Sequence, residues 1–148
     1  MGTQVKGCAP DEMGISPIFA IPALLNWTGV ELKDIDIIEL NEAFASQTIA
    51  CIQELGLDED KVNPNGGAIA LGHPTGATGA RQTATLFGEL RRQDKEMGIV
   101  SMCASTGLGV ASLFVRESYH GVPEPRTCRI TMTMMMMAVM TAPPRAEV

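Results

Sequence analysis

The sequence predicts an α/β fold in which helices pack on a mixed β-sheet. Residues 35–40, "IDIIEL", form a short and nearly continuous apolar run, typical of a strand buried on both faces. Residues 97–103 and 108–117 resemble two further strands joined by a tight, glycine-containing turn. Helical patterns separate the first strand from these two, and this order of elements is typical of a layered α/β domain.

The first expected helix precedes the buried strand. Ser16 is a suitable N-cap, Pro17 occupies the first helical position and Gly29 closes the helix. Pro22 is expected to kink or restart this helix, because proline lacks the backbone N–H that the helix interior needs.

Two more helices are expected after the strand. The second ends before Gly56, and its apolar residues recur at helical spacing: Ala45, Ile49, Ile52 and Leu55. The third begins near Pro74 or Thr78 and runs to about Arg92, with a predicted inner face of Ala80, Ala84, Phe87 and Leu90.

The length of 148 residues is typical of about one domain, and the composition changes near residue 117. Residues 118–148 hold four of the nine prolines and six of the ten methionines. The apolar stretch at 130–142 is shorter than the ~20 residues needed to span a bilayer. We therefore expect a folded domain over 1–117 and a poorly ordered tail over 118–148, with a methionine-rich functional surface as the alternative.

Composition excludes several classes of function. A net charge of −6 argues against a surface for nucleic acid or anionic membranes, which needs clustered lysine and arginine. Four cysteines without a CxxC pair, beside only two histidines, argue against a zinc site or a disulfide framework. We therefore expect reduced thiols in an intracellular protein. The sequence shows neither a signal peptide nor a peroxisomal targeting signal. The sequence contains no Walker lysine and no G-x-S-x-G elbow, so neither a nucleotide-binding nor a hydrolase function is supported.

His73 is the first candidate for chemistry. It lies in "GGAIALGHPTGATGAR" (66–81), which contains five of the fifteen glycines, and these allow a bulky ligand to approach the backbone. A position near a helix N-terminus would keep the ring neutral and available as a base. An isolated histidine can equally be an ordinary surface or core residue.

Cys103 and Asn41 both follow predicted strands, where open α/β sheets place their sites. Cys103 is either a small buried hydrophobic residue or a functional thiol. Asn41 is either a helix N-cap or a residue that holds a water near a developing oxyanion. The pair Gly107 and Gly109 only faintly resembles a dinucleotide-binding loop, because Ser112 replaces the third glycine.

Four stretches taken together resemble the C-terminal half of a thiolase. They are "MGISP" (13–17), "NEAFA" (41–45), "GGAIALGHPTGATGAR" (66–81) and "CASTGLG" (103–109), in the order and spacing of the family. "GHPTGATG" also fits β-ketoacyl synthases, which share the fold. Those enzymes carry other residues at the places of Asn41 and Cys103, so the thiolase resemblance is the stronger one.

The resemblance implies a function and roles for individual residues. Thiolases cleave a 3-ketoacyl-CoA with free CoA, or run the reverse condensation, through an acyl-cysteine. His73 would be the base that activates the nucleophilic thiol, and Cys103 would exchange the proton at the α-carbon. Asn41 would fix a water that, with His73, binds the thioester oxygen. The residues expected to bind substrate are Met13, Phe44, Gly72, Ser105 and Gly107.

Two departures from the family pattern affect these expectations. Ser105 stands where the family has glycine, so a weakened oxyanion hole is expected if that position needs glycine-like backbone angles. The acyl-accepting cysteine of thiolases lies in the N-terminal half, and Cys8 and Cys51 are poor substitutes. We therefore expect a C-terminal half that is inactive alone and works with an N-terminal half.

The resemblance also bears on substrates, partners and location. It favours the degradative branch of fatty-acid β-oxidation over an acetoacetyl-CoA-forming thiolase, with CoA and acyl-CoA as substrates and no cofactor or metal. Homo-oligomers are typical of the family, and a peroxisome or mitochondrion is implied by resemblance only. The alternative from another class is a non-catalytic acyl-CoA-binding or assembly module.

Overall fold

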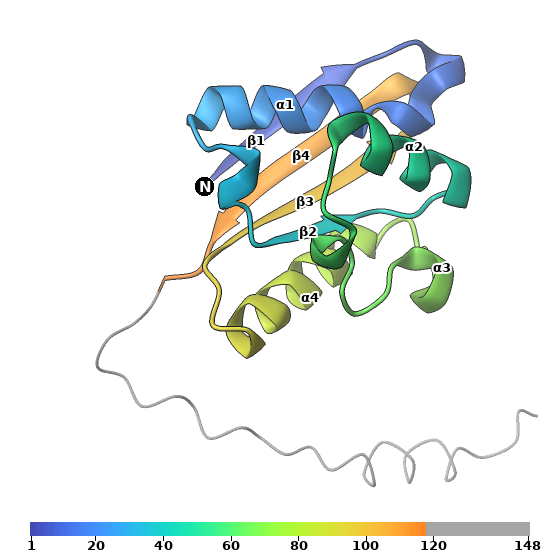
Figure 1. The fold of residues 1–148 in the computed structure, drawn as a ribbon. Coiled ribbons are helices and arrows are strands. Elements are labelled where there is room, and N and C mark those ends of the chain that lie inside the picture. Colours follow the sequence, from blue (N-terminus) through green and yellow to red (C-terminus); the bar gives the residue numbers. More distant parts are fainter. Residues whose placement is uncertain (118–148) are drawn as a thin grey trace, which may run out of the picture. The chain divides into compact units, whose positions relative to one another are not determined.

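The computed structural model describes residues 1–117, and the predicted tail at 118–148 lies outside the described residues. Four strands form one sheet in the order β1-β4-β3-β2 (Figure 1). Strand β2 (Ile37–Leu40) runs parallel to β3 (Met97–Ala104), whereas β4 (Leu108–Val115) is antiparallel to β3 and to β1 (Gly2–Gly7). The mixed sheet is therefore confirmed.

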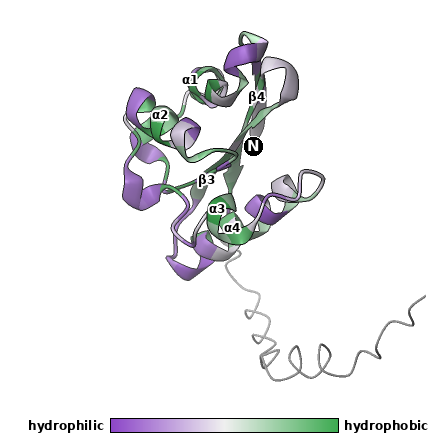
Figure 2. Cartoon of the chain, turned by 90° about the vertical axis from the view of Figure 1, so that its right-hand side faces the viewer, coloured by the Kyte–Doolittle hydropathy of each residue, from purple (hydrophilic) through white to green (hydrophobic). Residues whose placement is uncertain are grey.

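Helices cover both faces of this sheet. Helices α1 (Pro17–Thr28) and α2 (Ala45–Leu55) lie on one face, and α4 (Thr78–Arg92) with the short α3 (Ala68–Leu71) lies on the other (Figures 1 and 2). The side chains of alternate residues in β2 point to opposite faces of the sheet. Ile38 and Leu40 join the core under α1 and α2, whereas Ile37 packs with Leu86 and Leu90 of α4.

Helix α1 ends as predicted but does not break at Pro22. Gly29 closes the helix in a left-handed conformation with φ 72°. The helix continues through Pro22, so the expected restart is wrong, whereas the expected kink stays a prediction. Pro22 is on the exposed side of α1, where water can replace the hydrogen bond that the proline removes.

The apolar residues at helical spacing in the first half of α2 do not form its inner face. Ala45 and Ile49 are exposed, and the buried residues of the helix are Gln47, Thr48 and Cys51. The polar side chains of this face have partners: Gln47 accepts a hydrogen bond from the backbone N–H of Phe44, and the Thr48 hydroxyl donates to the Phe44 carbonyl. Because its polar groups are satisfied, a polar face can pack inward.

Helix α4 begins at Thr78, one of the two predicted starts, but its inner face also differs from the prediction. Ala80 and Ala84 are exposed. The buried residues include polar ones and are Thr78, Gln82, Leu86, Glu89 and Leu90. Gln82 donates to the carbonyl of Glu39 in β2, so this helix is attached to the sheet by polar contacts as well as by leucines.

Strand β1 and helix α3 were not predicted. Strand β1 is a mostly exposed edge strand of six residues that begins and ends with glycine, which leaves almost no apolar pattern to detect. Helix α3 has a single turn and begins directly after Gly67 within the glycine-rich segment.

Candidate active site

Asn41 lies directly beyond β2, at the end where the chain leaves the sheet. Its backbone N–H donates to the carbonyl of Ser101 in β3 over 2.9 Å, and its side chain is fully buried. Helix α2 begins at Ala45 with Phe44 as its N-cap, so Asn41 does not cap a helix. The N-cap alternative for Asn41 is wrong, and the buried amide needs another explanation.

His73 is in the exposed loop between α3 and α4. Gly72 ends α3 with φ 95°, a conformation that L side chains rarely adopt. This turn directs the following residue toward β2, where the Nε2 atom of His73 lies 3.3 Å from the amide nitrogen of Asn41. The structure thus brings together two predicted site residues from different loops.

The contacts of His73 favour one of the two tautomers of its imidazole ring. The Thr78 hydroxyl donates to the Pro74 carbonyl over 2.9 Å, and this uses its single hydrogen. Nδ1 of His73 lies 2.7 Å from the same hydroxyl oxygen and is the donor in the tautomer that satisfies both contacts. In that tautomer the lone pair of Nε2 faces the Asn41 amide, and Nε2 is the atom that can act as a base.

Cys103 lies near the end of β3, on the strand next to β2 and two residues beyond the Ser101 carbonyl that binds Asn41. It is half-buried, and burial raises the pKa of its thiol. The thiol therefore remains protonated at neutral pH and is suited to donate a proton. Cys51 is fully buried within α2, where burial raises its pKa as well.

The residues predicted to bind substrate are distributed around this end of the sheet. Met13 is half-buried in a 3-10 helix at Pro10–Ile15, and Phe44 is 56% exposed at the start of α2. Ser105 and Gly107 form a 3-10 turn between β3 and β4. A Cβ on Gly107 would collide with the carbonyl oxygen of Cys8, and its φ of 83° is left-handed.

Beneath the site, a buried carboxylate connects β2 to α4. Glu39 is fully buried and lies 3.2 Å from the Arg81 guanidinium. Burial raises the pKa of Glu39 to about 7, the Arg81 charge opposes this, and the charges of Glu42 and Glu89 add to it. Glu89, bound by the Arg92 guanidinium and the Asn65 amide, has a pKa lowered to about 2.

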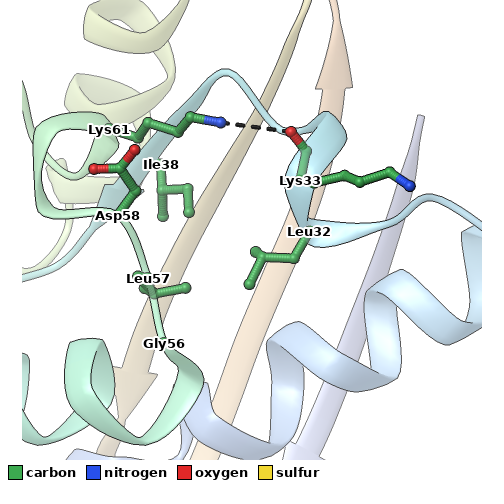
Figure 3. Close-up of a pocket in the computed structure, with 7 residues that line it drawn as sticks. All are labelled: Leu32, Lys33, Ile38, Gly56, Leu57, Asp58 and Lys61. Atoms are coloured by element: carbon green, nitrogen blue, oxygen red, sulfur yellow. Dashed lines mark hydrogen bonds between the residues drawn. The ribbon is translucent and has the colours of Figure 1, made fainter.

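A pocket of about 230 Å³ lies elsewhere, between the turn at Leu32–Lys33 and the segment from Gly56 to Lys61 (Figure 3). The ammonium group of Lys61, which lines this pocket, donates to the backbone carbonyls of Ile35 and Lys33. Lys61 thus connects the two segments that line the pocket. None of the predicted site residues lines it.

Within residues 1–117, no three histidine, cysteine or carboxylate side chains are grouped as a metal site would require. Over the same residues, no helix is both long and apolar enough to cross a membrane.

The four resembling segments therefore lie at loops or element junctions of one α/β domain. Comparison with known proteins agrees: the family described as "Thiolase, C-terminal domain" matches residues 1–116. The chain belongs to the thiolase C-terminal domain family. The thiolase fold class predicted from the sequence is thereby confirmed.

Individual thiolases show the extent of the match. The chain is 54% identical over 114 residues to the peroxisomal 3-ketoacyl-CoA thiolase of Saccharomyces cerevisiae, covering 77% of this chain and 27% of that protein. The solved structure of the peroxisomal thiolase of that yeast has a TM-score of 0.74 at 53% identity, covering 79% of this chain and 34% of that chain. Human mitochondrial 3-ketoacyl-CoA thiolase in complex with CoA has a TM-score of 0.78 at 47% identity, covering 80% and 30%. The chain thus spans about a quarter of the length of the curated thiolase it matches.

One expectation about the thiolase loops needs correction. Ser105 was expected to be strained where the family has glycine, but the described non-glycine residues with positive φ are Asn63, Asp94 and Thr106. Thr106, at φ 70°, adopts the left-handed conformation in this turn, so Ser105 can present its N–H without that strain.

Sequence reasoning missed the supports of this thiolase-like site. Thr78 was considered only as a helix start, and Glu42 was given no role. Asn63, buried beside β2, was also overlooked. A threonine five residues after the histidine was the available signal, because a hydroxyl at a helix start can reach back into the preceding loop.

Proposed function

We propose that this chain supplies the C-terminal half of a 3-ketoacyl-CoA thiolase active site, as in fatty-acid β-oxidation. The observation that carries the proposal is the contact between Asn41 and His73. It places Nε2 of His73 within 3.3 Å of the side-chain nitrogen of the buried Asn41. The curated relatives named as 3-ketoacyl-CoA thiolases support the choice of reaction, and the human CoA complex supports CoA as a substrate.

In the proposed reaction, Nε2 of His73 takes the proton of a cysteine thiol supplied by another polypeptide segment. The thiolate attacks the 3-keto carbon, the bond between C2 and C3 breaks, and the acyl group stays on that cysteine. The carbanion at C2 takes the Cys103 proton, which gives acetyl-CoA. Free CoA then gives its thiol proton to the Cys103 thiolate and takes the acyl group as the shortened acyl-CoA, and the cysteine that leaves recovers its proton from His73. Such proton transfers are typically worth roughly 10²–10⁴-fold in rate.

The roles of the other site residues are part of this proposal. Asn41 holds a water that, with His73, binds the thioester oxygen. Met13 and Phe44 line the acyl chain, while Gly72, Ser105 and Gly107 leave room for the thioester at the loop backbones. The proposed chemistry uses CoA and acyl-CoA as substrates and needs neither a cofactor nor a metal.

The proposed nucleophile belongs to a partner half. Within residues 1–117 the side chain of Cys51 is fully buried, and the half-buried thiol of Cys8 donates to the carbonyl of Glu12, so we assign the nucleophile to neither. We propose that an N-terminal thiolase half packs on α4, whose outer face carries the exposed small residues Ala80, Ala84 and Gly88. The yeast thiolase structure, described as five-layered and constructed from two core domains of identical topology, supports this arrangement.

Oligomeric state and compartment are also proposals. The assembled protein would be a homo-oligomer, as thiolases typically are. The peroxisomal yeast relative and the mitochondrial human one support a peroxisome or a mitochondrion as its location.

Thiolysis of a 3-ketoacyl-CoA by free CoA tests the proposal. The chain is assayed alone and with the N-terminal half of the yeast peroxisomal thiolase, and activity is expected only in the mixture. His73→Asn keeps a donor for Thr78 but removes Nε2, so it should lower the rate by roughly 100-fold or more. His120→Asn, the same change at the only other histidine, is the matched control.

The other outcomes of this assay decide between the alternatives. Tight acyl-CoA binding without turnover in the mixture would favour the non-catalytic module. Turnover by the chain alone would contradict both functions, because neither provides for a nucleophile within this chain. Thiolysis of acetoacetyl-CoA without thiolysis of longer 3-ketoacyl-CoAs would favour the acetoacetyl-CoA-forming branch.

A further inference from the structure

We infer that Glu42 is a positioning residue, whose carboxylate fixes the distance between Asn41 and His73. Glu42 follows Asn41 directly in the chain and is half-buried. One of its oxygens accepts from the Asn63 side-chain amide over 2.9 Å, and the other accepts from the backbone N–H of Ile69 over 3.0 Å. The same carboxylate therefore holds two separate points of the segment that leads to His73.

The first of these points is already fixed to the sheet. The Asn63 side chain accepts from the N–H of Leu40 and donates to the carbonyl of Leu40, at 2.9 and 2.8 Å. Its backbone N–H also donates to the carbonyl of Ile38 over 2.9 Å. Asn63 is buried, so these contacts are shielded from competing water. Glu42 thus binds a segment that cannot move relative to β2.

The second point is the start of α3, the short helix that precedes His73. Ile69 is the second residue of α3, so its N–H has no carbonyl partner within the helix. Within this single turn, the N–H groups of Ala70 and Leu71 donate to the carbonyl of Gly67, and that of Gly72 donates to the carbonyl of Ala68. His73 comes next. A shift of the carboxylate would therefore move α3 and His73 together.

Helix α3 approaches Glu42 so closely that any side chain at position 67 would have to displace the carboxylate. A Cβ on Gly67 would overlap the carboxyl carbon and both carboxylate oxygens of Glu42. Gly67 has a φ of −103°, which other residues adopt freely, so this glycine is required by space and not by its backbone angles. The glycine allows α3 to approach the carboxylate within hydrogen-bond distance.

The chemistry of the contact requires a carboxylate. Both partners are N–H donors, and a carboxylate offers two acceptor oxygens, whereas the amide of glutamine offers one oxygen and one NH₂ group. In Glu42→Gln, one of the two donors would face the NH₂ group. The variant keeps the size and shape of the side chain but releases either Asn63 or α3.

The inference rests on the proposed function only for its effect on the rate, so the test has an arm that needs no catalysis. In the isotopically labelled chain, NMR measures the Nε2 chemical shift of His73 and the cross-peak between its ring and the Asn41 amide. His120→Gln assigns the histidine signals. Glu42→Gln should weaken the cross-peak and shift Nε2 toward the value of an imidazole without a donor. Glu54→Gln, the same change at an exposed glutamate of α2, should change neither.

Gly67→Ala gives an independent test, because it keeps the Glu42 carboxylate but displaces it. It should reproduce the NMR change, whereas Gly76→Ala should not, since a Cβ on Gly76 has no atom within 4 Å. In the assembled enzyme, Glu42→Gln should lower kcat by about tenfold or more with little change in KM, because misplaced catalytic groups cost rate and not ground-state binding.

An unchanged Asn41–His73 signal in both Glu42→Gln and Gly67→Ala would overturn the inference, even if the parent chain shows no thiolysis. Loss of the whole fold in both variants, measured by circular dichroism, would overturn it as well, because Glu42 would then be a general structural residue. A parent without turnover whose variants show the NMR change would contradict only the proposed function.

Discussion

The hydroxyl oxygen of Thr78 accepts a hydrogen bond from Nδ1 of His73 over 2.7 Å, while its own hydrogen goes to the Pro74 carbonyl. Thr78 is the first residue of α4 and is buried, so its position is fixed by the helix. With Nδ1 as the donor in this contact, Nε2 is the basic nitrogen of the imidazole. The orientation of the His73 imidazole therefore depends on the position of the first residue of α4.

Thr78→Val should therefore lower the rate of thiolysis by the assembled enzyme by roughly tenfold or more, because Nε2 is no longer fixed as the basic nitrogen. Valine preserves the volume and branching of the side chain. Thr85→Val is the matched control, since the Thr85 hydroxyl also donates to a carbonyl four residues earlier in α4 but contacts no histidine. Equal rate losses in the two variants would mean that the helix and not the imidazole is affected.

Glu39 predicts a decrease in stability as the pH rises from about 5 to 8. Its pKa is about 7 in the fold and 4.5 as a reference, so the folded state binds more protons between these values. The stabilisation is complete below pH 4.5 and is lost as the pH rises through 7, on the order of 3 kcal/mol in total. Urea unfolding at a series of pH values measures it.

Glu39→Gln should flatten this dependence, because the amide mimics the protonated acid and cannot ionise. The variant should match the parent near pH 5 and exceed its stability at pH 8. Glu54→Gln should keep the slope of the parent. If Glu39→Gln has the same slope as the parent, another group is responsible for it.

Gly107 and Gly88 predict opposite effects of alanine. Gly107→Ala introduces a collision with the Cys8 carbonyl at a left-handed φ, and should lower the free energy of unfolding by about 2–4 kcal/mol. Gly88 is exposed within α4 and a Cβ there meets nothing within 4 Å, so Gly88→Ala should raise it by about 0.5–1 kcal/mol. Urea unfolding of both variants distinguishes the two signs.

Ala84→Arg should prevent complementation by the N-terminal half without unfolding this chain. Ala84 is exposed on α4, where the partner half is proposed to pack, and a charged side chain would be buried there without a partner. Gln53→Arg, on the exposed side of α2 and on the other face of the sheet, should leave complementation intact. Co-purification of the two halves measures the effect, and an unaffected complex would place the interface elsewhere.

The sequence predicted the elements whose patterns are strong and local. The run at residues 35–40 and the glycines that end α1 and α2 required no tertiary information, because burial and left-handed caps leave direct signals. The inner faces of α2 and α4 could not be predicted in this way. Their buried residues include Gln47, Gln82 and Glu89, whose burial depends on partners from distant segments.

The same limit applies to the site. Asn41, His73 and Cys103 were found because their residue types and loop positions resemble a known family. Their supports were not found, since the contacts of Glu42 with Asn63 and Ile69 join residues 21 and 27 positions apart. No periodic pattern marks such contacts, so only the folded chain shows them.

The side chain of Asn63 also has a consequence for solubility. Strand β2 forms one edge of the sheet, and exposed edges are templates on which other chains can add strands and aggregate. Here Asn63 occupies both the N–H and the carbonyl of Leu40, its backbone takes the carbonyl of Ile38, and Lys61 takes that of Ile35. Two side chains and one short backbone contact thus close this edge to strand addition.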